Sequence, residues 1–112
     1  MEFPPDQLEE LKTLFDGVSS AEEGGFAYFL LPSLQLPPGC SSEKVDALLC
    51  PMQRDGYPSR LFFQAQIRSR EQRNWNATGV RILERNWYAF SWTVPTGLRL
   101  AQLVGAHLKG LR

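Results

Sequence analysis

The sequence is poor in the side chains from which catalytic and metal centres are built. Its 112 residues include two cysteines, Cys40 and Cys50, and one histidine, His107. Residues of these types at these spacings do not form a zinc site. Two cysteines are also too few for the disulfide framework of a small secreted domain. Glycine-rich phosphate loops, serine elbows and paired-carboxylate motifs are also missing. We therefore expect no metal, no cofactor and a reduced, cytoplasmic protein.

The sequence also lacks a long apolar run. No stretch approaches the roughly 20 apolar residues of a membrane span. Residues 1–5 are acidic and proline-rich, whereas a secretory signal is basic and then apolar. Hydrophobic residues make up 43% of the chain and charged residues 21%, a composition that is typical of a globular domain. We expect a single domain over residues 1–112 and no membrane partner.

Net charge is zero at pH 7, but the charges are unevenly distributed along the chain. Residues 1–50 contain two basic and nine acidic side chains, a balance of −7. Residues 51–112 contain ten basic and three acidic side chains, a balance of +7. One interpretation is that the two halves attract each other within one fold. The other is that the second half presents a basic face to an acidic partner.

The first segment, residues 1–24, is expected to form a helix followed by a loop. Asp6 is the expected N-cap, and Glu9 three residues later would complete a capping box. Apolar residues recur at helical spacing at Leu8, Leu11, Phe15 and Val18. Glu22-Glu23-Gly24-Gly25 is expected to be the loop.

Residues 25–67 are expected to form the sheet. The predicted strands are 26–31, 33–36, 45–50 and 57–67, with Pro32 separating the first two. Asp55-Gly56 is a strong turn dipeptide, because glycine takes a positive φ without a Cβ clash. Pro58 then fixes its own φ and keeps Tyr57 extended. The result is a Tyr-Pro corner beside a buried strand.

The last part of the chain is expected to contain an irregular segment, a strand and a helix. Residues 68–86 hold five arginines around Trp75 and show no clear periodicity. Residues 87–111 are expected to supply an aromatic strand and a closing amphipathic helix capped by Thr96. The predicted fold class is therefore α+β, an antiparallel meander sheet with an N-terminal helix and a C-terminal amphipathic helix.

Few side chains are candidates for a catalytic role. Cys50 follows an apolar strand, so we expect a buried and inert thiol. Cys40 lies in a loop and is expected to be more exposed, which makes it a weak candidate for a catalytic nucleophile. His107 lies on the apolar stripe of the last helix, where a packed, hydrogen-bonded histidine is the expected outcome.

The arginine- and tryptophan-rich segment 68–92 is the candidate binding region. Its candidate residues are Arg68, Arg70, Arg73, Trp75 and Trp87. Such a segment is compatible with nucleic-acid binding through phosphate contacts and base stacking, and equally with a protein interface. Because the net charge is zero, nucleic acid is the less favoured partner.

Three stretches carry a resemblance to a known family. Tyr28 to Leu31 with Leu36-Pro37-Pro38-Gly39 resembles a first hairpin and its Leu-Pro-x-Gly turn. Val45 to Pro51, with Gly56-Tyr57-Pro58 and Phe62-Phe63, resembles a strand and Tyr-Pro corner. Trp87 to Ser91 with the closing helix resembles an aromatic-Phe-Ser element. Together they resemble the ubiquitin-conjugating-enzyme (UBC-like) fold, and within it the divergent bacterial proteins encoded near ubiquitin-like modifiers.

The sequence departs from this family at the position that matters for catalysis. Active members carry the thioester-forming cysteine after the Tyr-Pro corner, with a His-Pro-Asn motif before it. The corresponding residues 64–86 contain no cysteine and no histidine. Cys40 and Cys50 both precede Tyr57 and Pro58, so neither matches the catalytic position.

The resemblance implies a non-catalytic adaptor, or pseudoenzyme, of a bacterial ubiquitin-like modification system. Its expected partners are a ubiquitin-like protein, an activating enzyme or a deconjugating peptidase. One alternative is an active conjugating enzyme that uses Cys40 as a displaced thiol. The other is a nucleic-acid-binding module that uses segment 68–92.

Overall fold

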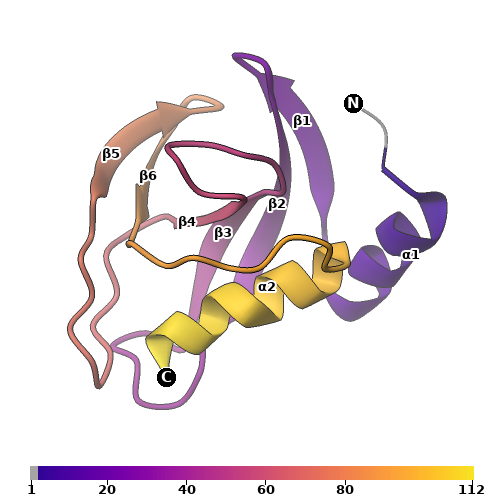
Figure 1. Ribbon diagram of the computed structural model, residues 1–112. Helices are drawn as coiled ribbons and strands as arrows, with labels where there is room; N and C mark the ends of the chain where they lie inside the picture. Colours follow the sequence, from indigo (N-terminus) through magenta and orange to yellow (C-terminus); the bar gives the residue numbers. More distant parts are fainter. Residues whose placement is uncertain (1–2) are drawn as a thin grey trace.

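A computed structural model of the chain describes residues 3–112 and confirms the α+β class (Figure 1). All strand pairs are antiparallel, and the six strands lie in one curled sheet in the order β1-β2-β3-β4-β6-β5. The elements are α1 (Pro5–Leu14), β1 (Ser19–Glu23), β2 (Phe26–Gln35), β3 (Lys44–Cys50), β4 (Arg60–Phe63), β5 (Ala77–Ile82), β6 (Arg85–Ala89), α2 (Leu100–Leu108) and the 3₁₀ turn η1 (Lys109–Leu111).

Both helices pack on one face of the sheet and form the main core. Leu11 of α1 is fully buried, and Leu103 and Val104 of α2 are buried against Phe29 and Phe63 of the sheet. The amphipathic spacing in the sequence produces this packing, because residues three and four apart share one helix face. Within residues 3–112, neither helix has the length and apolarity that crossing a bilayer requires.

The opposite face of the sheet buries a second, smaller core without a helix. Trp87 of β6 packs there with Tyr28, Leu48 and Phe62. This is possible because the sheet curls, which brings its two outer hairpins together. The Glu23 carboxylate at the β1–β2 turn accepts a 2.8 Å hydrogen bond from the backbone N–H of Leu83 at the β5–β6 turn.

The prediction for the N-terminal segment was wrong in two respects. The helix begins at Pro5, and Asp6 caps nothing; its carboxylate instead receives a 2.9 Å hydrogen bond from Arg99. The expected loop contains the edge strand β1, which pairs with β2 over its whole length. Apart from half-buried Ala21, the residues of β1 are exposed. The sequence therefore has no apolar alternation here that would indicate a strand.

Pro32 does not separate two strands, because β2 runs continuously through it as one ten-residue strand. The ladder to β3 shifts between Leu31 and Leu34, and Ser33 takes a φ of 50°. This is a β-bulge, which absorbs a residue that cannot join the ladder. Asp46 Oδ1 stabilises the bulge by accepting a 2.9 Å hydrogen bond from the Ser33 N–H.

The boundaries in the second half also differ from the prediction. The expected irregular segment 68–86 contains β5, whose ladder to β6 shifts between Thr78 and Val80. The strand expected over 57–67 is limited to Arg60–Phe63. Helix α2 begins at Leu100 rather than after Thr96, and the Gln102 side chain accepts a hydrogen bond from the Arg99 N–H at its start.

The β5–β6 turn is strained, and a glycine in it should increase the stability of the fold. Leu83 and Glu84 have φ values of 50° and 66°, a conformation that costs a residue with a Cβ roughly 1–2 kcal/mol. Because Glu84 is exposed, Glu84→Gly should raise the free energy of unfolding by about 0.5–1 kcal/mol in urea titrations. Glu84→Ala, which keeps the Cβ, is the control and should gain nothing. Equal effects of the two substitutions would contradict this explanation.

Candidate functional site

The Tyr-Pro corner forms as the sequence predicts. Arg54 and Tyr57 exchange two backbone hydrogen bonds of 2.9 Å, and Asp55 and Gly56 between them take positive φ values of 53° and 86°. This is the geometry of a two-residue hairpin turn of the primed type, which favours Asp-Gly. The corner leads directly into β4, so it holds the start of the central strand.

A buried guanidinium lies behind the corner. Arg60 is only 3% exposed, and its guanidinium lies 4.6 Å from the ring centre of Tyr57. It donates hydrogen bonds to Asp55 Oδ2 at 3.0 Å, Asn76 Oδ1 at 2.5 Å and the carbonyl of Phe90 at 3.4 Å. A buried charge requires such partners, because an unpaired ion in the interior is strongly unfavourable.

The Tyr57 hydroxyl continues this network. It donates to Ser91 Oγ at 2.8 Å and accepts from Asn76 Nδ2 at 2.9 Å. The hydrogen bond with Ser91, aided by that from Asn76 and by the Arg60 charge, lowers the pKa of Tyr57 below its ordinary value, against the opposing effect of burial. The corner is therefore tied to the residue before β5 and to the segment after β6.

His107 lies in the protein interior, as the sequence predicts. The side chain is buried on α2, and its Nε2 lies 2.9 Å from Ser59 Oγ. Burial, with a smaller contribution from the Arg60 charge, lowers the pKa of His107 to about 4. At neutral pH the imidazole is uncharged, and it is enclosed rather than presented to a substrate.

Neither thiol is activated. Cys50 is completely buried at the end of β3, as expected, and burial raises its pKa. Cys40 is only partly exposed, and its Sγ lies 3.6 Å from the carbonyl oxygen of Leu111, to which the thiol donates. Burial raises the pKa of Cys40 as well. A nucleophilic cysteine needs a lowered pKa, so neither environment favours attack.

The segment after β4 forms a polar depression of about 640 Å³, which we call the arginine pocket. The loop 37–41 lies beside residues 66–75 and the C-terminal end of the chain, at the same end of the molecule (Figure 1). The pocket is lined by residues 66–73 and Trp75. Two reciprocal hydrogen bonds join Ser41 to Arg68, at 2.8 and 3.0 Å.

The arginine pocket brings together four of the five predicted binding residues. Arg68 and Arg70 are exposed, Arg73 is half-buried, and Trp75 lies at one side of the pocket. Trp87 is not part of this surface. It is buried in the second core, where its indole N–H donates to the carbonyl of Ile82, so its inclusion was wrong.

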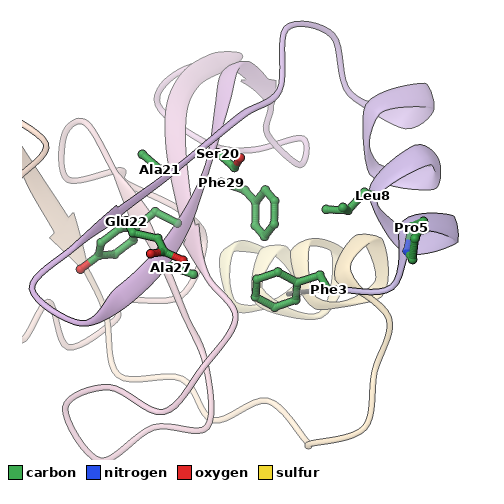
Figure 2. A pocket seen from close by; sticks show the side chains of 9 residues that line it. Phe3, Pro5, Leu8, Ser20, Ala21, Glu22, Ala27 and Phe29 are labelled. Atoms are coloured by element: carbon green, nitrogen blue, oxygen red, sulfur yellow. The ribbon is translucent and has the colours of Figure 1, made fainter. Parts of the chain in front are cut away.

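A second depression of about 690 Å³ was missed in the sequence because β1 was expected to be a loop. It lies between the start of α1 and the β1–β2 hairpin (Figure 2). Phe3 and Phe29 meet edge to face, with ring centres 5.3 Å apart, and Leu8 lies beside them. Its lining holds the carboxylate of Glu22 but no thiol and no imidazole.

Among residues 3–112, no three histidine, cysteine, aspartate or glutamate side chains gather in a way that would hold a metal ion. Comparisons with protein-family models, with curated proteins and with solved structures give no significant match to this chain. The interpretation of the site therefore depends on its own residues.

The pKa of His107 predicts a specific loss of stability in acid. The unfolded histidine binds a proton near pH 6.5, whereas the folded one does so only near pH 4. Stability from this group is complete above pH 6.5 and decreases as pH falls toward 4, by up to about 3 kcal/mol. His107→Gln, which cannot titrate, should flatten the dependence of unfolding free energy on pH in this range. An unchanged slope would show that His107 is not the group responsible.

Proposed function

We propose that this protein is a non-catalytic member of the ubiquitin-conjugating-like fold, which acts as an adaptor in a bacterial ubiquitin-like modification system. The observation that carries the proposal is the absence of a nucleophile where that fold requires one. Residues 64–86, after the Tyr-Pro corner, contain no cysteine and no histidine. A thioester cannot form there without a thiol.

The surroundings of the corner support a structural role rather than a catalytic one. Tyr57 and Arg60 are engaged with Asn76, Ser91 and Asp55. A satisfied network of side-chain hydrogen bonds makes a loop rigid. The corner then serves to hold the sheet and its loops as a binding scaffold.

The remaining two interpretations are less well supported. Cys40 as a displaced catalytic thiol would need a lowered pKa, whereas burial raises it. Nucleic-acid binding would need accessible aromatic rings for stacking, whereas Trp87 is buried. The proposed partners are therefore proteins: a ubiquitin-like protein, its activating enzyme or a deconjugating peptidase.

A combined charging and binding assay tests the proposal. The protein is incubated with a ubiquitin-like protein from a bacterial modification operon, the cognate activating enzyme and ATP, and the products are separated on gels with and without reductant. We expect no reductant-sensitive adduct, together with micromolar binding to at least one component of the system by calorimetry.

Cys40→Ser is the matched control for the assay. It should bind as the original protein does, because the thiol is assigned no role in partner recognition. A reductant-sensitive adduct that disappears in Cys40→Ser would establish the displaced-thiol enzyme instead. Failure to bind the ubiquitin-like protein, the activating enzyme or the peptidase would refute the adaptor function.

A further inference from the structure

We propose that the arginine pocket binds a short acidic segment of a partner protein, with carboxylates paired to the guanidinium groups of Arg68 and Arg70. The inference deepens the proposed function and rests on it, because it assumes that the partner is a protein. It assigns to that partner a specific feature, a run of aspartate or glutamate side chains.

The backbone of the pocket is held by contacts from two other parts of the chain. Arg68 exchanges hydrogen bonds with Ser41 of the β2–β3 loop. On the other side, Arg73 Nε donates to the carbonyl of Gly110 at 2.6 Å, and its guanidinium lies 4.8 Å from the ring centre of Trp92. Arg73 is therefore a positioning residue, which fixes the segment against η1 and the segment after β6.

The other two arginines are not used in this way. Among residues 3–112, the side chains of Arg68 and Arg70 make no ion pair and no hydrogen bond, and both are exposed. By contrast, four other arginines pair with carboxylates in the fold: Arg54, Arg60, Arg85 and Arg99. The aliphatic part of Arg70 lies against Gly39. A side chain at position 39 would place its Cβ 3.3 Å from Nε of Arg70. Its side chain is thus partly oriented while its charge stays unpaired.

The charge of the pocket favours an anion. Its lining contains Arg68, Arg70 and Arg73 against one carboxylate, Glu71, which gives a local balance of +2. Guanidinium groups bind carboxylates through two parallel hydrogen bonds, a geometry that a lysine cannot reproduce. The depression has room for a few side chains, which suits a short segment.

An acidic protein segment fits this surface better than nucleic acid does. A long polyanion gains its affinity from many phosphate contacts, whereas the pocket lining offers three arginines and one carboxylate, Glu71. Base stacking would need a free ring at the pocket, but Trp75 meets Phe63 and Phe90 edge to face, with ring centres 6.0 and 5.1 Å away. Trp75 is therefore a partly buried side of the pocket, packed against the main core.

The test uses a blocked octapeptide in which aspartate and glycine alternate, with an asparagine–glycine counterpart as the uncharged control. Binding to the whole protein is followed at low salt by the NMR shifts of the amides of residues 66–75. We expect millimolar or tighter binding of the acidic peptide and none of its counterpart. The double substitution Arg68→Gln and Arg70→Gln should weaken binding by at least about tenfold.

Arg81→Gln is the matched control. Arg81 is an exposed arginine of β5 that does not line the pocket, so its substitution should change the affinity by less than twofold. Equal weakening by Arg81→Gln would mean that only the overall charge matters, which would overturn the proposal. So would an acidic peptide that shifts no amide of residues 66–75.

Further outcomes separate this inference from the proposed function. If a ubiquitin-like partner binds the double variant as well as the original protein, the pocket inference is wrong while the adaptor function stands. If the acidic peptide binds through Arg68 and Arg70 but no component of such a system does, the pocket stands and the adaptor function fails. Tighter binding of single-stranded oligothymidine, lost in the double variant, would replace the acidic segment by nucleic-acid phosphate.

Discussion

The buried guanidinium of Arg60 is the interaction on which the second half of the structure depends. It joins the Tyr-Pro corner through Asp55, the entry to β5 through Asn76, and the exit from β6 through the carbonyl of Phe90. Its charge also helps to keep the neighbouring His107 neutral. Because an ion in the interior is tolerated only when its hydrogen bonds are satisfied, these segments are held in one arrangement. The polar groups near the corner are thereby committed to the fold, whereas Arg68 and Arg70 of the arginine pocket have no ion-pair partner among residues 3–112.

The interior of the fold was more predictable than its edges. The apolar run of β3 predicts a buried strand, which the structure contains. The Asp55-Gly56 dipeptide predicts a tight turn, because glycine takes a positive φ. The edge strand β1 was not predictable, because its exposed residues carry no alternation and it exists only by pairing with β2. The cap assigned to Asp6 failed for a similar reason. Its carboxylate pairs with Arg99, which is 93 residues away in the sequence and could not be predicted from a local pattern.

The candidate site was predictable in composition but not in arrangement. The density of arginine in residues 68–73 made this segment the candidate binding region, and in the structure its three arginines line one depression. The sequence did not reveal which of these charges remain free, because Arg73 finds its partners at Gly110 and Trp92 near the end of the chain. It also could not separate Trp87 from Trp75. Both are aromatic residues near arginines, and only the curl of the sheet places Trp87 in a core.

The central claim is that neither thiol of this fold is activated, and on this ground we propose a function in binding. The most direct test is the rate at which iodoacetamide alkylates Cys40, measured against pH by mass spectrometry of the labelled peptide. Because burial raises the pKa of Cys40 above its ordinary value of 9.0, we predict slow labelling at neutral pH and a rate that still increases beyond pH 9. A plateau reached below pH 8, with labelling faster than that of free cysteine at neutral pH, would reveal an activated thiolate and contradict the account.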